Sequence, residues 1–441
     1  MKRRTILMAA ILMGVFAQGI AFAAGNADQP EKAAGPVTLR FSWWGNDARH
    51  NATLAAIDLF MKANPNIKIE AEYGGWDGYY TKLATMVAGG SAPDIMQTDV
   101  KFMPDIIAQG DVFYDLGSFK DKIDTSGFDK KFVDNWGVFN GKLVGLPLGI
   151  NGQTAIMNVS LMKKAGIPEN TVWSWNKIKE EGMKLRSVDP NVYMLLLDPF
   201  QVSEHIMWPW LSQLSGKQNF NSKEFTKNFT EAEAKMILTY VKDLLDTGVL
   251  VPFTQSSVFN VNQTENPLWT GGKVALYLNY TTHVVNAMHN APGVEVAVGR
   301  FPVAENAKHT SIGVQPSQLL TINAKSAHPA EAAAFVDFLF NNEGSIRALK
   351  LERSVPAVSK ARELLGAANM LDPTLSRAVN IALQHGGQVR TADLQWNAEI
   401  TQIVLEAVET VGYGKTAPET AAATMIRKID TKLMELKAAV K

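Results

Sequence analysis

The alternation of strand and helix patterns is the feature that most constrains how this chain folds. Residues 37–41 alternate apolar and polar side chains, as a half-buried strand does. A helical pattern over residues 54–61 follows and ends before a proline, because the residue before a proline disfavours helical geometry. A strand pattern over 67–73, a helical pattern over 79–88 and a strand pattern over 94–98 complete the series. This order predicts an α/β fold with a parallel sheet.

The same alternation recurs in the second part of the chain and then gives way to helices. Thr230 and Glu233 have the spacing of a capping box, which predicts that a helix begins there. Further strands are predicted over 154–158, 274–278 and 319–323, and further helices over 161–165 and 330–340. From residue 359 onward the pattern is almost entirely helical. We therefore expect two α/β lobes with a helical C-terminal region.

The first 36 residues differ in character from the rest. A positively charged start, a long apolar stretch and the small residues Ala21 and Ala23 are typical of a secretory signal peptide over residues 1–23. Residues 24–36 are polar and rich in Ala, Gly and Pro, which predicts a flexible leader. We therefore expect an exported chain whose ordered part begins near residue 37.

The composition argues against several classes of function. Basic and acidic residues number 43 each, so the chain lacks the excess of positive charge that nucleic-acid-binding proteins carry. It contains no cysteine, so neither disulfide bonds nor a thiol-linked lipid anchor can form. The seven histidines are scattered, and the sequence lacks the motifs of zinc peptidases, serine hydrolases and nucleotide-binding proteins. We therefore expect no cofactor, no metal, no nucleic-acid partner and no enzymatic activity.

Five short motifs resemble those of a known protein family. They are 76–79 (WDGY), 88–95 (AGGSAPDI), 140–147 (NGKLVGLP), 271–276 (GGKVAL) and 328–334 (HPAEAAA). In order and spacing they resemble the extracellular solute-binding proteins, family 1, that serve ATP-driven sugar importers. The resemblance covers the chain from about residue 37 to the C-terminus. It implies the type II periplasmic-binding-protein (Venus-flytrap) fold, in which two lobes enclose a ligand in a cleft.

The family resemblance also implies where the chain passes between the lobes. Crossings are expected near residues 148–152, near Asn279 and near residues 340–343. The N-terminal lobe would then comprise residues 37–148 and 280–340, and the C-terminal lobe residues 149–279 and 341–441. Gly149 and Gly152 suit a hinge, because glycine tolerates large changes of backbone angle. The alternative is that these glycines only mark the end of a strand.

Three further segments resemble one subgroup, the periplasmic proteins that bind oligogalacturonides. They are 41–45 (FSWWG) with Arg49 and His50 behind it, 313–317 (GVQPS) and 351–356 (LERSVP). This resemblance implies an acidic oligosaccharide as the ligand. Arg353 is the candidate for its carboxylate, because a guanidinium can bind a carboxylate through two parallel hydrogen bonds. Arg49 and His50 could assist or could lie on a solvated helix face, and Arg353 could instead pair with a neighbouring acid.

Tryptophans are the candidate platforms for a sugar ring, because they offer a large, rigid apolar face. Trp44 and Trp76 lie where the first two strands end, and ligands of open α/β sheets bind at the carboxyl ends of the strands. Successive strand residues face opposite ways, so we expect Trp44 to contact the ligand and Trp43 to face the core, with the reverse left open. By resemblance, Trp396 corresponds to an aromatic residue that stacks on the sugar, and helix packing is its alternative role. Among the other tryptophans, Trp208 and Trp210 could line the cleft, whereas Trp136, Trp173, Trp175 and Trp269 are expected to be structural.

Polar residues at the predicted strand ends and crossings complete the candidate site. Amide and carboxylate side chains suit sugar hydroxyls, which both donate and accept hydrogen bonds. Asp99 follows the third strand, and its alternative role is to cap the helix that begins near Met103. The other candidates are Asn151, Asn279, Tyr280, Gln315 and Ser317, each of which could instead be a satisfied structural group.

The sequence therefore predicts a periplasmic substrate-binding protein of an ABC carbohydrate importer. The resemblance implies that it binds an oligosaccharide between its lobes, delivers it to inner-membrane permease subunits and works as a monomer. The lack of an anchoring cysteine favours a free periplasmic location. Two alternatives stay open: a secreted carbohydrate-active enzyme, such as a lyase or glycosidase, and a receptor of the same fold for a neutral sugar.

Overall fold

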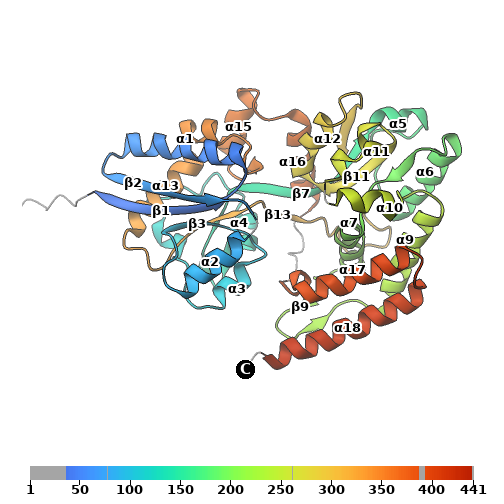
Figure 1. Cartoon of the computed structure of the whole chain (residues 1–441). Coiled ribbons are helices and arrows are strands. Elements are labelled where there is room, and N and C mark those ends of the chain that lie inside the picture. The colour runs from blue at the N-terminus through green and yellow to red at the C-terminus, as the bar shows by residue number, and fades with distance from the viewer. Residues whose placement is uncertain (1–35, 77, 261, 387–392, 440–441) are drawn as a thin grey trace, which may run out of the picture. The chain divides into compact units, whose positions relative to one another are not determined.

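The computed structural model describes residues 36–76, 78–260, 262–386 and 393–439, in the elements labelled in Figure 1. The predicted signal peptide (1–23) and all but the last residue of the predicted leader (24–36) lie outside the described residues. None of the helices in the described part of the chain combines the length and apolarity needed to cross a membrane.

The first sheet is built around the N-terminal strands. Its order is β2 (Ile67–Gly74), β1 (Val37–Trp44), β3 (Ile95–Thr98), β14 (Leu319–Ile322) and β6 (Leu146–Pro147). β1 runs parallel to β2 and β3, whereas β14 is antiparallel to β3 and β6. The parallel arrangement expected for the three N-terminal strands is therefore confirmed, whereas β14 comes from a distant stretch of the chain, enters in the opposite direction and makes the whole sheet mixed.

Five helices are grouped with the first sheet. They are α1 (Asp47–Ala63), α2 (Tyr79–Ala88), α13 (Pro329–Asn341), α14 (Glu343–Leu349) and α15 (Ser359–Ala367). α1 starts after Asn46, whose side chain accepts a hydrogen bond from the Arg49 N–H, and it ends ahead of Pro65 as predicted. α1 packs against β2, α13 and α14, and Figure 1 shows α1 and α13 beside the first strands. Shorter elements nearby are α3 (Met103–Ile107), α4 (Lys130–Trp136), β4 (Val138–Phe139) and β5 (Lys142–Leu143).

The second sheet is organised by one long strand, β7 (Gly149–Asn158). β7 pairs antiparallel with β11 (Val274–Tyr280) and β12 (Val296–Gly299), and β11 pairs parallel with β8 (Tyr193–Leu195). The first residues of β7 pair instead with β13 (Val314–Pro316) and β15 (Val355–Pro356). The small strands β9 (Phe220–Asn221) and β10 (Thr226–Lys227) form a separate pair.

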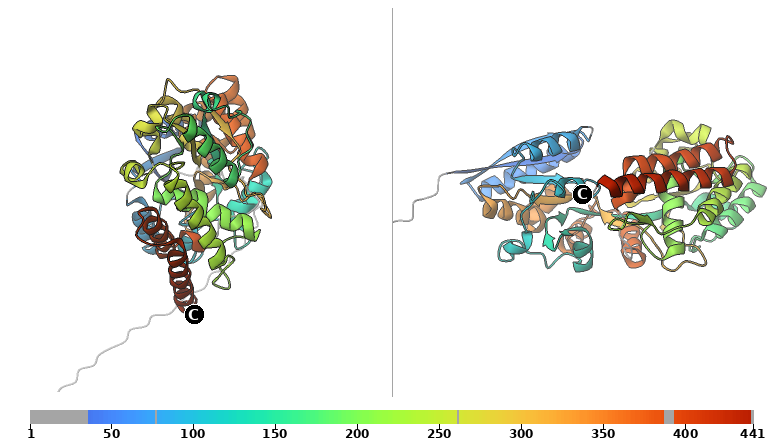
Figure 2. Two further views of the ribbon diagram at one scale, coloured as in Figure 1. Left: turned by 90° about the vertical axis from the view of Figure 1, so that its right-hand side faces the viewer. Right: turned by 90° about the horizontal axis from the view of Figure 1, so that it is seen from below.

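Helices make up most of the rest of the chain, including its C-terminal part as predicted. They are α5 (Val159–Lys164), α6 (Trp175–Val188), α7 (Pro199–Val202), the π-helix η2 (Ser203–Met207), α8 (Trp208–Ser215), α9 (Glu231–Asp246), α10 (Phe253–Ser256), α11 (Pro267–Thr270), α12 (Val284–His289), α16 (Pro373–His385), α17 (Ala398–Gly412) and α18 (Pro418–Ala439). The capping box at Thr230 and Glu233 is confirmed at the start of α9. α9, α17 and α18 pack on one another, and Figure 2 shows α17 beside α18.

Two of the three predicted crossings lie elsewhere. The chain enters the second sheet at Gly149 as expected, but Asn279 pairs with Thr154 inside that sheet, and β12 follows there too. The chain returns to the first sheet only between β13 and β14. α14 packs on α1, and α15 packs on α13, so the last passage lies between α15 and α16, which contacts β7 and β12. The strand and helix patterns could not reveal this, because a pattern does not specify which sheet an element joins.

Gly149 and Gly152 both lie inside β7, where neighbouring atoms come very close. A Cβ at Gly149 would lie 2.1 Å from the carbonyl oxygen of Arg353, and a Cβ at Gly152 would lie 2.3 Å from the Cβ of Ala382. Close packing therefore accounts for both glycines in this structure. Their role as a hinge stays a prediction.

The hydrophobic core takes up most of the tryptophans. Trp43, Trp173, Trp175, Trp269 and Trp136 are buried, which confirms the structural role expected for them. Trp208 and Trp210 are buried as well, and the Trp210 ring stacks on Trp175 with centroids 5.2 Å apart. These two residues belong to the core and do not line the cavity described below, contrary to the expectation that they could.

Candidate functional site

A polar cavity of about 270 Å³ gathers most of the predicted polar candidates. It is lined by Asp99, Lys101, Asn151, Phe200, Gln201, Glu204, His205, Asn279, Tyr280, Thr282, His283, Gln315, Pro316 and Ser317. All six polar candidates taken from strand ends and crossings are among them, namely Asp99, Asn151, Asn279, Tyr280, Gln315 and Ser317. They meet because β3, β11 and β13 end at this place and β7 runs past it.

Sequence reasoning missed the part of the cavity that α7 and η2 supply. Glu204 and His205 lie on the π-helical turn, a rare conformation that is frequent at functional sites. The Tyr280 hydroxyl donates to Glu204 Oε1 at 3.2 Å. His205 Nδ1 lies 3.1 Å from the Gln153 amide nitrogen. The available signal was an acid followed by a histidine inside a largely apolar stretch, because burying such groups is costly unless they are hydrogen-bonded or paired.

Burial controls the protonation of the ionisable groups in the cavity. It lowers the pKa of His205 to about 3 and that of His283 to about 4, so both imidazoles are neutral at neutral pH. Burial also raises the pKa of Asp99 and that of Glu204, and the charge of Lys101 opposes both shifts. The cavity therefore combines two carboxyl groups, one ammonium and two neutral rings, which can accept and donate hydrogen bonds in several directions.

Two of the polar candidates also hold local structure. Asp99 Oδ1 accepts a hydrogen bond from the Lys101 N–H at 2.9 Å. The alternative role of Asp99 as a helix cap was wrong, because α3 begins after Phe102 and receives no side-chain cap. The Asn279 side chain donates to the Tyr277 hydroxyl and accepts from the Tyr280 N–H. Each side chain is thereby held in a fixed orientation, which favours recognition of one ligand geometry.

A cluster of aromatic rings follows the ends of the first strands. Trp44, Trp76, Tyr79, Tyr80 and Phe102 form it, with the Trp44 and Trp76 centroids 5.1 Å apart and those of Tyr80 and Phe102 3.9 Å apart. Trp44 is 7% exposed, whereas Trp76 is 46% exposed. Trp76 thus presents the open ring of the cluster, and the buried Trp44 meets it edge to face; neither residue is among the lining residues of the polar cavity. Trp43 is fully buried and stacks on Tyr73, so it cannot reach a ligand at this position.

Trp396 faces the loop that follows β3. The Lys101 ammonium lies over its ring at 4.2 Å from the centroid, within the range of a cation–π contact. Lys101 also lines the cavity, so the contact places the Trp396 ring next to a cavity residue. The role of Trp396 as a sugar platform stays a prediction.

The arginine candidates lie outside the cavity lining. Arg353 is 6% exposed; its Nε donates to Gln97 Oε1 at 3.0 Å and its Nη2 to Thr53 Oγ1 at 2.9 Å. Arg49 donates to the carbonyl oxygens of Glu352 and Trp44. His50 Nδ1 accepts from the Trp43 indole at 3.1 Å. The guanidinium of Arg353 is therefore engaged inside the protein, and a ligand carboxylate would have to displace these bonds to reach it.

Metal chemistry has little basis in the residues at hand. Within the described ranges, no group of three or more histidine and acidic side chains is arranged to hold a metal ion. The cavity offers hydrogen bonds and flat rings, and these suit a polyhydroxylated ligand.

Comparisons with known proteins agree with this geometry. A family model described as bacterial extracellular solute-binding protein matches residues 45–346. A crystal structure of a periplasmic solute-binding protein from Pectobacterium atrosepticum is 27% identical, with a TM-score of 0.81, and the match covers 91% of this chain and 99% of that one. A family 1 extracellular solute-binding protein from Alicyclobacillus acidocaldarius is 29% identical, with a TM-score of 0.76 over 90% and 99% of the two chains. A periplasmic oligogalacturonide-binding protein from Yersinia enterocolitica, solved with saturated digalacturonic acid, is 27% identical, with a TM-score of 0.76 over 92% and 100%. The two-lobed α/β fold expected from the sequence is thus confirmed.

Proposed function

Because the chain belongs to the bacterial extracellular solute-binding proteins, we propose that it is the oligosaccharide-binding component of an ATP-driven importer. The observation that carries the proposal is the cavity in which six residues chosen for sugar recognition come together. A ligand bound there would contact residues that follow strands of both sheets, so it would bind best to the conformation in which those residues converge and would shift the population toward it.

The lining suits a sugar because of its hydrogen-bonding groups and its neighbouring rings. Amide and carboxylate side chains, such as those of Gln315 and Asp99, can bond to ring hydroxyls. Trp76 and Trp396 are the candidates for the apolar faces of the sugar, because one is exposed and the other touches Lys101. A small solute without hydroxyls would leave most of these groups without partners, which costs binding free energy.

The charge of the ligand is the finer question, and two classes are favoured by different observations. The relative from Yersinia enterocolitica is solved with an acidic disaccharide, which favours an oligogalacturonide. The cavity favours a neutral sugar, because Lys101 is the only lysine or arginine among its described lining residues and faces both Asp99 and Glu204. We propose a neutral sugar unit at this position, with the acidic ligand as the second candidate.

Titration calorimetry separates the two classes. Digalacturonic and trigalacturonic acid are titrated at neutral pH beside neutral malto-, xylo- and arabino-oligosaccharides, with wild type and Lys101→Met. Removal of the ammonium should weaken an acidic ligand by roughly tenfold or more, whereas a neutral ligand should change little. Lys120→Met, an exposed lysine outside the cavity, is the matched control. Binding of no sugar at all would contradict the proposed function, and tight binding of the acids alone would contradict only the neutral class.

The enzyme alternative is tested in the same samples. Glycoside hydrolysis needs a pair of carboxyl groups that flank the scissile bond, and elimination needs a base at a ring C–H; Asp99 and Glu204 are the carboxyl groups among the described lining residues of the cavity. A receptor returns its ligand unchanged, so chromatography after prolonged incubation should recover only the starting oligosaccharide. Accumulation of shorter or unsaturated products would contradict the receptor proposal.

Location and partners complete the proposal. We propose a free periplasmic monomer that docks on inner-membrane permease subunits. Fractionation of cells should place the mature chain in the periplasmic extract, with its N-terminus after residue 23. Size-exclusion chromatography with light scattering should give the mass of one chain. Recovery in the membrane fraction would contradict the free location, and a larger mass would contradict the monomer.

A further inference from the structure

The short turn between α14 and β15 holds an unusual concentration of buried polarity and backbone strain. Lys350 and Ser354 both have positive φ angles, of 48° and 75°, which non-glycine residues rarely adopt. Such conformations persist only where the surroundings hold them in place, and they cluster at functional and switching regions. Arg353, between them, is almost completely buried. The strained backbone and the buried arginine therefore indicate that this turn does more than connect α14 to β15.

The side chain of Arg353 ties this turn to the first sheet. Its two hydrogen bonds reach Gln97 on β3 and Thr53 on α1, both of which are fully buried. Gln97 lies two residues before Asp99 and donates in turn to the carbonyl oxygen of Trp44. Arg49 adds a second tie, through its bond to the Glu352 carbonyl. The Arg353 guanidinium thus connects the turn with the end of β3, which Asp99 of the cavity follows.

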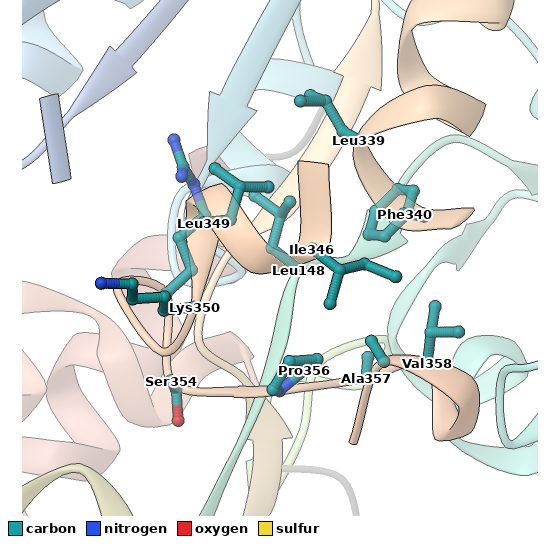
Figure 3. A pocket seen from close by; sticks show the side chains of 12 residues that line it. Leu148, Leu339, Phe340, Ile346, Leu349, Lys350, Ser354, Pro356, Ala357 and Val358 are labelled. Carbon is teal, nitrogen blue, oxygen red and sulfur yellow. The ribbon is translucent and has the colours of Figure 1, made fainter. Parts of the chain in front are cut away.

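The main chain of the same turn holds the passages between the two sheets. The Ser317 hydroxyl donates to the Arg353 carbonyl at 2.5 Å, and Ser317 lines the cavity. The Ser354 hydroxyl donates to the Ile150 carbonyl at 2.7 Å, and β15 pairs with the first residues of β7. Figure 3 shows Ser354, Lys350 and Leu148 around a small apolar pocket beside this junction. The turn therefore touches both β7 and the link from β13 to β14.

We propose that Arg353 is a positioning residue, which fastens both of these passages to the first sheet and so sets the places of Ser317 and Asp99 at the cavity. It does this without touching the ligand. The proposal rests on the proposed function only for its effect on affinity, since the fastening itself needs no ligand.

The burial of the Arg353 guanidinium is energetically unfavourable, which supports a positioning role for it. Arg353 Nη1 is buried without a hydrogen-bond partner among the described residues, and burial together with the nearby Arg49 lowers the pKa of Arg353 to about 9. A well-packed apolar side chain in place of a buried charge is often neutral or stabilising, so stability alone gives little reason for an arginine here. The planar guanidinium of an arginine, in contrast, carries several N–H donors and can hold two separate acceptors in a defined geometry.

The first test measures the fastening without ligand. Arg353→Met keeps an unbranched, flexible side chain, although a shorter one, and removes all the hydrogen-bond donors. Hydrogen exchange should then rise at residues 148–152 and 314–319 and stay as in wild type in α9 and α18. Because the chain has no cysteine, single cysteines at the exposed Lys62 and Lys184 give one clean spin-label pair, whose distance distribution should broaden in the variant. Arg186→Met is the control, since Arg186 bonds to the carbonyl of Val192 far along the chain from this junction.

The second test separates positioning from direct contact. Whichever probe sugars bind wild type, acidic or neutral, Arg353→Met should weaken all of them by a similar factor, roughly 3- to 30-fold. A ligand carboxylate held by Arg353 would instead give a loss for galacturonic oligosaccharides alone. Unchanged exchange and an unchanged distance distribution would overturn the proposal.

Partial variants keep the test decisive if Arg353→Met does not fold. Thr53→Val and Gln97→Leu each remove one acceptor and should each give a smaller rise in exchange at residues 148–152. If neither variant changes exchange there, Arg353 does not fasten the passages. If no sugar binds wild type, the proposed function fails while the exchange result still stands.

Discussion

Acidification should destabilise this protein through two imidazoles of the cavity, those of the buried His205 and the half-buried His283. His205 and His283 have folded-state pKa values of about 3 and about 4, against a usual 6.5, because burial disfavours their charged forms. Below pH 6.5 these two histidines are therefore protonated in the unfolded chain, whereas they stay neutral in the folded chain. The contribution of the two neutral histidines to the free energy of unfolding is therefore fully present above pH 6.5, and it is lost as the pH falls toward 4 and then 3.

The size of the effect follows from the linkage relation. One pKa unit corresponds to about 1.4 kcal/mol, and pH 5 lies about 1.5 units below the pKa of an unfolded histidine, so each imidazole should cost about 2 kcal/mol between pH 7 and 5. Burial raises the pKa of Asp99 and that of Glu204, and these groups act in the opposite sense because the folded state binds their protons more readily. The pH dependence of the free energy of unfolding of wild type alone is therefore less informative than the difference in that dependence between wild type and a histidine variant.

The assay compares wild type with His205→Gln by urea unfolding at pH 7, 6 and 5, followed by tryptophan fluorescence. The variant lacks the proton site, so wild type should lose about 2 kcal/mol more than the variant over this range. The exposed His289→Gln is the control and should keep the wild-type dependence. Equal pH dependence of wild type and His205→Gln would refute the assignment of a buried, neutral imidazole.

Three further changes probe the fold. Thr230→Ala removes the hydroxyl that caps α9 and should lower the free energy of unfolding by about 1 kcal/mol, measured from the urea midpoint. Gly152→Ala places a methyl group 2.3 Å from an atom of α16 and should cost roughly 1–3 kcal/mol, whereas Gly366→Ala, with nothing within 4 Å, should cost nothing; equal midpoints would contradict the packing argument. Gln213→Leu should cost roughly 1–3 kcal/mol, because it leaves the buried Trp175 indole N–H without its 2.9 Å acceptor; a loss under 1 kcal/mol would contradict that hydrogen bond.

Local sequence signals predicted the elements well, because those signals act over a few residues. The helix expected over 79–88 is α2 with the same bounds, and the capping box at Thr230 starts α9. Both rest on short-range backbone and side-chain bonds. The cavity candidates at strand ends came together for a similar reason, since the end of a strand fixes where the next side chains lie.

The features that the sequence patterns did not predict depend on contacts between distant parts of the chain. Arg353 bonds to Gln97 and Thr53, which are 256 and 300 residues away in sequence, so no local pattern could reveal that its guanidinium is occupied. The antiparallel entry of β14 and the true places of the crossings are of the same kind. The ionisable pair Glu204 and His205 stood out in its apolar surroundings but did not point to the cavity, because the π-helical turn that aims both side chains there has no established local sequence signal.

A crystal structure of the protein with a bound oligosaccharide tests the central claim most directly. The account predicts a sugar ring in the cavity, hydrogen-bonded to Asp99 and Tyr280, with Trp396 against its face and Lys101 moved off that ring. An intact oligosaccharide bound at some other surface, with Asp99 and Tyr280 untouched, would contradict the account.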